Sequence, residues 1–241
     1  MAARKEIREY DLLEFSRCLL RQPHLTPYSK PLEVQAAEQA VRTVLWEMFE
    51  HKIVPDAAAV RESLQLAWRE VREDTRQRLT GMAVIVNRIR ELITTVRVVS
   101  PVTHYVQKMG GTSVTGDYAV VAPLNQKHLR DVLILRLRHK DDCPRDRRAY
   151  SDAVSWSRWL HLHFHEPRIE TVRVLNFGLD FDGQWGEEIS MDENQVRAGL
   201  TVLADAAQSY EGFPSPGAYC NTCLTHACAV QKEGNRWIPT A

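Results

Sequence analysis

Three of the five cysteines in this chain lie within nine residues, and this cluster limits the fold more than any other feature. Cys220, Cys223 and Cys228 lie in YCNTCLTHACAV, with the spacing C-x2-C-x4-C, and Cys18 and Cys143 lie far from them. An odd number of cysteines in a chain expected to be cytosolic does not suit a disulfide framework. Clustered thiols in a reducing compartment indicate a metal or iron–sulfur site.

Three thiolates leave one ligand position to fill. His226 lies inside the cysteine segment, but it is separated from Cys228 by a single residue, which strains a tetrahedral site. Cys18, in the apolar segment FSRCLLRQP, and Cys143, in the polar turn KDDCPRDRR, are the remote alternatives. A remote cysteine closing the site would tie the two ends of the chain together. Four thiolates suit either Zn²⁺ or a [4Fe–4S] cluster.

Composition indicates one soluble globular domain. The chain has 241 residues, 44% of them hydrophobic, and its 31 Lys and Arg balance 31 Asp and Glu. A neutral total argues against a coat of positive charge but allows a local basic groove. No apolar run approaches the ~20 residues of a membrane span, and the charged N-terminus has no signal-peptide core. We therefore expect a cytoplasmic protein with no membrane partner and no evident small-molecule substrate.

Hydrophobic periodicity predicts helices first, then strands, then a mixture. The pattern predicts helices over 1–22, 32–52, from Pro55-Asp56 onwards, 75–93, 149–165 and 192–210, and strands over 94–107, 113–121, 131–138 and 168–177. Residues 23–31, with three prolines, are expected to form a loop, and Gly110-Gly111 a turn. This order predicts a single α/β domain over residues 1–241, with a mixed sheet flanked by helices.

The element order, one N-terminal cysteine and a C-terminal cysteine triplet together resemble the iron–sulfur subgroup of RecB-like PD-(D/E)XK nucleases. In that subgroup, which includes the CRISPR-associated nuclease, AddB and exonuclease V, four cysteines hold a [4Fe–4S] cluster. The resemblance implies that Cys18, Cys220, Cys223 and Cys228 are the ligands, in a module formed by about 12–22 and 214–232, and that Cys143 is spare. It also implies a PD-(D/E)XK-like fold. Zinc is the alternative metal.

The catalytic residues of that family are mostly replaced here. The family places a His on a helix, an acid on one strand, apolar-(Asp/Glu)-x-Lys on the next strand and Gln-x-x-x-Tyr on a following helix. The matching positions hold Leu45, Asp117, Arg136, Arg138, Ser155 and Trp159. Only Asp117 is retained, and apolar-(Asp/Glu)-x-Lys does not occur in 113–140. One carboxylate beside two guanidinium groups is more typical of a salt bridge than of a hydrolytic metal site.

Arg136 and Arg138 stand at the positions where the family has its second acid and its lysine. Arginines at these positions remove affinity for metal and add affinity for phosphate. The segment 127–148 carries eight Lys and Arg against four Asp. The candidate nucleic-acid contacts are Arg136, Arg138, Lys140, Arg145, Arg147 and Arg148. A solvated surface with local ion pairs is the alternative interpretation of such a charge run.

Histidines and tryptophans carry weaker signals. His161, His163 and His165 would share one face only on a strand, and we expect them at a helix end. Trp46 and Trp68 are predicted to lie in the core. Trp156 and Trp159 fit either the core or a stacking platform for bases. The segment LDFDGQWGEE, residues 179–188, is predicted to form an acidic hairpin.

Three functions follow from these patterns. The first is a catalytically inactive nuclease-like iron–sulfur protein that binds DNA or docks on a DNA-processing or transcription complex. The second is an active Mg²⁺- or Mn²⁺-dependent DNA exonuclease whose site has moved to Asp117 with Asp131 or with Asp141 and Asp142. The third is a protein-interaction scaffold or redox-sensing regulator.

Overall fold

The structure is a computed structural model that describes residues 5–10, 12, 32–71, 82–109, 112–125, 130–138, 152–179, 186–209, 230–233 and 236–239. Its elements in chain order are β1 (Lys5–Arg8), α2 (Leu32–His51), α3 (Ala57–Val71), α4 (Met82–Thr95), β2 (Val96–Met109), β3 (Thr112–Pro123), β4 (Asp131–Arg138), α5 (Ala153–His165), β5 (Thr171–Gly178), β6 (Gly186–Ile189), α6 (Glu193–Ser209), β7 (Val230–Glu233) and β8 (Arg236–Pro239). None of the described helices is long and apolar enough to cross a bilayer.

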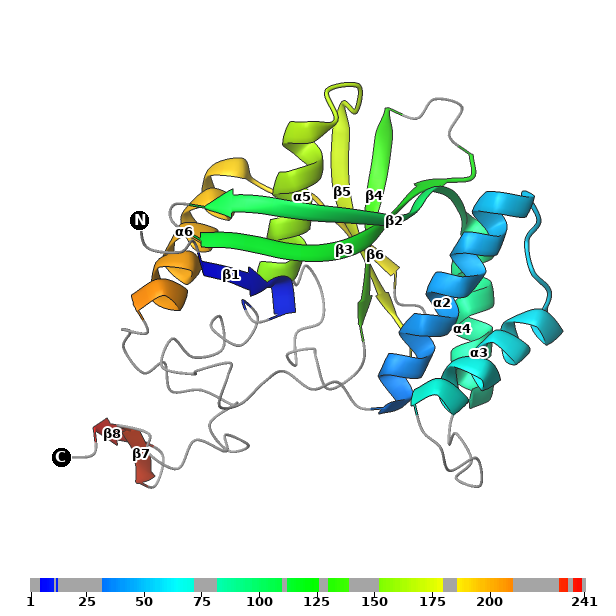
Figure 1. The fold of residues 1–241 in the computed structure, drawn as a ribbon, viewed down its shortest axis with the longest axis horizontal. Coiled ribbons are helices and arrows are strands. Elements are labelled where there is room, and N and C mark those ends of the chain that lie inside the picture. Colours follow the sequence, from blue (N-terminus) through cyan, green and yellow to red (C-terminus); the bar gives the residue numbers. More distant parts are fainter. Residues whose placement is uncertain are drawn as a thin grey trace.

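A six-stranded mixed sheet organises the fold (Figure 1). Strands β2, β3 and β4 are antiparallel neighbours, α5 crosses over, and β5 returns parallel to β4. Strand β6 pairs antiparallel with β5 at one edge. Strands β7 and β8 form a separate two-stranded hairpin. The mixed α/β fold expected from the sequence is therefore confirmed.

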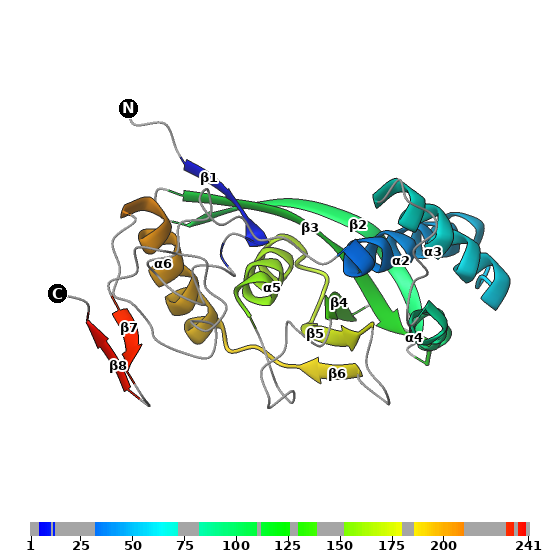
Figure 2. The same ribbon diagram turned by 90° about the horizontal axis from the view of Figure 1, so that it is seen from below.

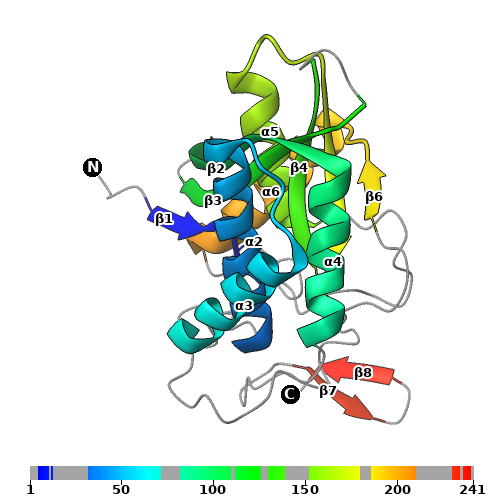
Figure 3. The same ribbon diagram turned by 90° about the vertical axis from the view of Figure 1, so that its right-hand side faces the viewer.

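Helices cover both faces of the sheet, as Figure 2 and Figure 3 show from two directions. One apolar cluster joins α2, α3 and α4 to the odd-numbered side chains Leu133, Leu135 and Leu175 of β4 and β5. The other joins α5 and α6 to the even-numbered side chains Val132 and Ile134 of β4. Because both faces are covered, β4 and β5 are buried on both sides rather than on one.

Three aspartates begin helices by the same local chemistry. The Asp56 carboxylate accepts hydrogen bonds from the backbone N–H groups of Ala58 and Ala59, both at 2.9 Å. Asp152 and Asp192 cap α5 and α6 in the same way, at 2.8 and 2.9 Å. A carboxylate at this position satisfies N–H groups that the first turn leaves unpaired. The predicted helix start at Pro55-Asp56 is confirmed.

The N-terminal segment departs from the prediction. Residues 5–8 form a strand, where the sequence predicts a helix over 1–22, and this strand pairs parallel with residues 112–115 of β3. The four residues KEIR carry no strand pattern of their own, so the pairing with β3 determines their conformation. Trp46 is a second departure, because it is 53% exposed on α2, whereas Trp68 is buried as expected.

Strand β3 shares one of its edges between two partners. β1 pairs with residues 112–115 of this edge and β4 with residues 119–121, while β2 covers the other edge. Between the two partners lies Gly116, where an added Cβ would come within 2.5 Å of the Glu9 side chain. Gly116 is therefore required by the close approach of a buried carboxylate.

We predict that Gly116→Ala lowers the free energy of unfolding by about 1–3 kcal/mol, because Glu9 is buried and is held in place by hydrogen bonds from Arg158 and Tyr105. Urea denaturation followed by circular dichroism measures this. Ser113→Ala, a half-buried position on the same strand, is the control and should change stability by less than about 0.5 kcal/mol. Equal stability of the two variants would contradict the packing described for Gly116.

Candidate functional site

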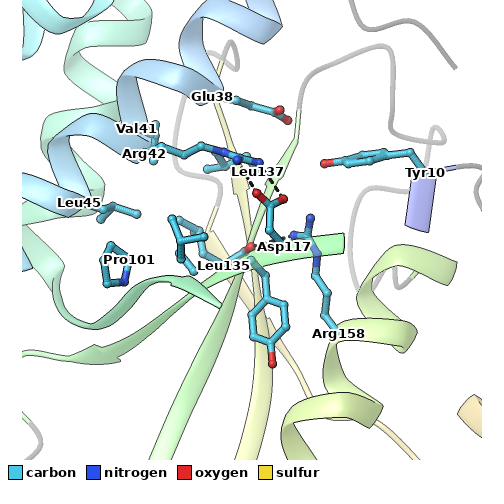
Figure 4. Close-up of a pocket in the computed structure, with 13 residues that line it drawn as sticks. Tyr10, Glu38, Val41, Arg42, Leu45, Pro101, Asp117, Leu135, Leu137 and Arg158 are labelled. Atoms are coloured by element: carbon cyan, nitrogen blue, oxygen red, sulfur yellow. Dashed lines mark hydrogen bonds and ion pairs between the residues drawn. The ribbon is translucent and has the colours of Figure 1, made fainter. Parts of the chain in front are cut away.

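A pocket opens where α2, β3, β4 and α5 meet (Figure 4). Its volume is about 430 Å³ including the solvent at its mouth. Apolar side chains form most of the wall, and charged groups gather on one side of it. The residues that line it are Tyr10, Glu38, Val41, Arg42, Leu45, Pro101, Val102, Asp117, Tyr118, Ala119, Leu135, Leu137 and Arg158.

Asp117 lies at the centre of the charged side of the pocket. Its side chain points from β3 toward α2, where both carboxylate oxygens accept hydrogen bonds from Arg42, at 2.6 and 3.0 Å. Burial alone would raise the pKa of Asp117, but the hydrogen bonds and charge of Arg42 outweigh it and lower the pKa. The carboxylate is therefore ionised and already bound to a cation of the same chain.

Arg158 reaches the pocket from the opposite side, on α5. It is buried, and its guanidinium donates to both carboxylate oxygens of Glu9, at 2.5 and 2.9 Å. The Tyr105 hydroxyl donates to Glu9 at 2.9 Å and contacts the Ser157 hydroxyl at 2.7 Å. Burial would lower the pKa of Arg158, but the charge of Glu9 raises it above its ordinary value.

Charges of alternating sign thus cross the pocket wall. The series runs from Arg42 on α2 through Asp117 on β3 and Arg158 on α5 to Glu9, directly after β1. The charge of Arg158 also contributes to the lowered pKa of Asp117. Two ion pairs thus link α2 to β3 and α5 to the residue that follows β1, and the four charges of the series sum to zero.

The pocket side of β4 presents leucines rather than charged groups. Side chains alternate along a strand, so Leu135 and Leu137 line the pocket while Arg136 and Arg138 point to the opposite face, toward α5. The sequence match predicted these two arginines beside Asp117, and that prediction is wrong. Asp117 does form a salt bridge, as expected, but its partner is Arg42.

Arg136 and Arg138 share one carboxylate inside the protein. Their guanidinium groups donate to the same oxygen of Asp152, at 3.0 and 2.6 Å, while the other oxygen accepts the N–H and hydroxyl of Ser155. All three charged side chains are at most 1% exposed. Burial would raise the pKa of Asp152, but the two arginines lower it far below its ordinary value. In this arrangement neither arginine reaches a phosphate at the surface.

Several predicted site residues lie outside the described part of the chain. They are Cys18, Cys143, Cys220, Cys223, Cys228, His226, Lys140, Asp141, Asp142, Arg145, Arg147 and Arg148. Their predicted roles stay predictions. Asp131, the alternative partner of Asp117, begins β4 and does not line the pocket. The expected loop over 23–31, the Gly110-Gly111 turn and residues 180–185 of the acidic hairpin also lie outside.

Sequence reasoning missed Glu9, Arg42, Asp152 and Arg158. Glu9 and Arg158 are 149 residues apart, so no local pattern could have joined them. Asp152 did carry a signal, because an aspartate directly before the first residue of an apolar helix is typical of an N-cap. Arg42 lies one turn before Trp46 on the exposed side of α2, where a single charge indicates nothing specific.

No protein-family model matches the chain, and no curated protein matches it. Among solved structures, one similar chain is that of the crystal structure of SSO0001. The two are 12% identical, the similarity covers 89% of this chain and 92% of that one, and the TM-score is 0.34. Similarity at this level defines neither a family nor an activity.

We predict that Asp152→Asn lowers the free energy of unfolding by about 3 kcal/mol or more at pH 7, because two buried guanidinium groups lose their shared counter-charge. An aspartate with a depressed folded-state pKa stabilises the fold above its ordinary pKa of about 3.8, and this stabilisation is lost as the pH falls below that value. The difference in free energy of unfolding between wild type and Asp152→Asn should therefore be constant near pH 7 and become smaller in acid.

Urea denaturation between pH 7 and pH 2.5 measures this difference. Asp192→Asn keeps a side-chain oxygen that can cap α6 and removes only an exposed charge, so this control should cost about 0.5 kcal/mol or less. If Asp152→Asn and Asp192→Asn lowered the free energy of unfolding equally at every pH, the buried contacts of Asp152 with Arg136 and Arg138 would be contradicted.

Proposed function

We propose that this chain is a nuclease-like protein that does not cleave phosphodiesters and that binds DNA or docks on a DNA-processing complex. The observation that carries the proposal is the composition of the pocket. In the nuclease resemblance, a helix, two adjacent strands and a following helix supply the catalytic groups, in that order. Here α2, β3, β4 and α5 line one pocket in the same order, but with different chemistry.

The chemistry of the pocket does not favour a hydrolytic metal. Mg²⁺ and Mn²⁺ need several oxygen ligands that are free to coordinate, together with a water positioned for attack. Asp117 and Glu38 are the carboxylates among the described lining residues, and both oxygens of Asp117 accept from Arg42. The two residues of β4 that line the pocket are Leu135 and Leu137, which offer no ligand to a metal. Arg136 and Arg138, at the positions matched to the family's acid and lysine, bind Asp152 on the other face of the sheet. The Arg42 guanidinium thus neutralises the negative charge of Asp117, which a metal ion would neutralise in an active nuclease.

The proposed DNA contacts are the four remaining basic residues of the segment between β4 and α5. Lys140, Arg145, Arg147 and Arg148 lie in 139–151, which begins after Arg138 and ends before Asp152. The buried 2.6 Å contact between Arg138 and Asp152 holds the two ends of this segment together. Arg136 and Arg138 therefore anchor the segment, and the four residues beyond them would supply the charge that phosphates bind.

We propose further that Cys18, Cys220, Cys223 and Cys228 hold a [4Fe–4S] cluster, with zinc as the alternative. Four thiolates are the donor set that both groups take. Leu12, six residues before Cys18, and Leu203 of α6, seventeen residues before Cys220, belong to the same apolar cluster. The chain segments that lead to the two groups of cysteines therefore start from one region of the fold. When bound, such a cluster supplies folding free energy by cross-linking the chain ends.

We predict that the full chain binds DNA without cutting it. Fluorescence anisotropy with labelled single- and double-stranded DNA should give an affinity that falls steeply with salt, because bound phosphates release counterions. Replacing Lys140, Arg145, Arg147 and Arg148 together by Ala should reduce the slope of log affinity against log salt by about 3. The same DNA should stay intact with Mg²⁺ or Mn²⁺.

In the control variant, four exposed arginines outside this segment are replaced by Ala, namely Arg61, Arg69, Arg90 and Arg168. This variant should bind DNA like wild type. Cleavage that Asp117→Ala abolishes would support the active exonuclease instead. Absence of binding to any nucleic acid at low salt would overturn the DNA proposal and favour the interaction scaffold or redox regulator.

We predict that Cys→Ala at position 18, 220, 223 or 228 prevents folding to a soluble protein, whereas Cys143→Ala does not. Anaerobic purification with iron and sulfide analysis distinguishes the metals. A broad absorption near 400 nm with about four irons per chain indicates [4Fe–4S], and a colourless protein with one zinc indicates the alternative. Equal solubility of all five variants would contradict the ligand assignment.

A further inference from the structure

A pair of histidines lies on α5, separate from the pocket. His161 and His165 are one helical turn apart, so their side chains lie on the same face of the helix. Their rings stack at a centroid distance of 4.4 Å with an interplanar angle of 20°. The helix expected for these histidines from the sequence is confirmed.

Both rings are oriented by hydrogen bonds to their Nδ1 atoms. The His165 Nδ1 lies 2.9 Å from the backbone carbonyl oxygen of His161, which can only accept, so the imidazole donates. The His161 Nδ1 lies 2.9 Å from the Tyr118 hydroxyl, which can donate or accept. When that hydroxyl accepts, both Nε2 atoms carry lone pairs. A hydrogen bond to the second ring nitrogen is the arrangement that orients metal-ligating histidines in proteins.

We propose that His161 and His165 form a two-histidine site for a divalent transition-metal ion of the Zn²⁺ or Ni²⁺ type. Two histidines spaced i and i+4 on one helix face are a known way to hold such an ion. Two nitrogens bound to one ion at about 2.1 Å each lie no more than about 4.2 Å apart. The ring centroids are 4.4 Å apart and the ring planes are within 20° of parallel, so the Nε2 lone pairs, which lie in those planes, converge on one ion only after the two rings rotate toward each other.

Within the residues that the structure describes, no group of three or more His, Cys, Asp or Glu is placed to hold an ion. The proposed site thus has two protein ligands, and water fills its other positions.

His163 provides a matched control on the same helix. It lies two residues from each member of the pair but points elsewhere, because its ring stacks on Trp159 at 4.6 Å and its Nε2 lies 3.8 Å from Glu193. Removing His163 changes the histidine content of α5 by the same amount as removing His165, without touching the proposed ligands.

Calorimetric titration of the full chain with NiCl₂ tests the proposal. Wild type and His163→Ala should bind one equivalent of Ni²⁺ that His165→Ala loses or binds at least tenfold more weakly. The difference between the two variants separates this site from any binding by the cysteines, which both retain. Tyr118→Phe, which removes the hydrogen-bond partner of His161, should weaken the same equivalent by about 10- to 100-fold.

Two results would overturn the proposal. One is Ni²⁺ binding by His165→Ala that equals binding by His163→Ala. The other is equal loss in both variants, which would indicate non-specific binding by surface histidines. Because His165 is exposed, its replacement should leave the fold intact, and a circular dichroism spectrum identical to that of wild type checks this.

Discussion

The buried ion pair between Glu9 and Arg158 is the interaction on which the arrangement of the pocket depends. It joins the end of β1 to α5, and Tyr105 of β2 and the Leu135 carbonyl of β4 also bond to it. Breaking one side of such a pair leaves a charge in a place that water does not reach, which costs several kcal/mol. The same pair requires a glycine at position 116 of β3, so one contact constrains four of the six strands in the main sheet.

A second buried charge cluster lies on the same side of the sheet, and it serves a different purpose. Asp152 ends the segment between β4 and α5, caps α5 and neutralises two arginines of β4. The two clusters together explain how a strand with the sequence DVLILRLR is buried on both faces despite its arginines. Arginine suits this use because its planar guanidinium offers several donors and stays charged.

Periodicity in the sequence was sufficient for most of the fold, since α2, β2, β3, β4, β5 and α6 lie where apolar spacing predicts them. It was insufficient wherever a residue's environment comes from a distant segment. Residues 5–8 form β1 because they pair with β3. Trp46 has the spacing of a core residue but lies on the exposed side of α2. In the candidate site, Asp117 was found from its motif, whereas Arg42 and Arg158 were not, because their partners are 75 and 149 residues away.

The position of β1 also has a consequence for synthesis of the chain on the ribosome. β1 is made first, but its partner strand follows about a hundred residues later, and Arg158 follows 149 residues after Glu9. At an elongation rate of about 5–20 residues per second, Arg158 is synthesised on the order of ten seconds after Glu9. During that time residues 5–10 have no strand or helix to pack against. β1 is therefore among the last strands of the sheet to be paired, although it is made before the other strands of that sheet.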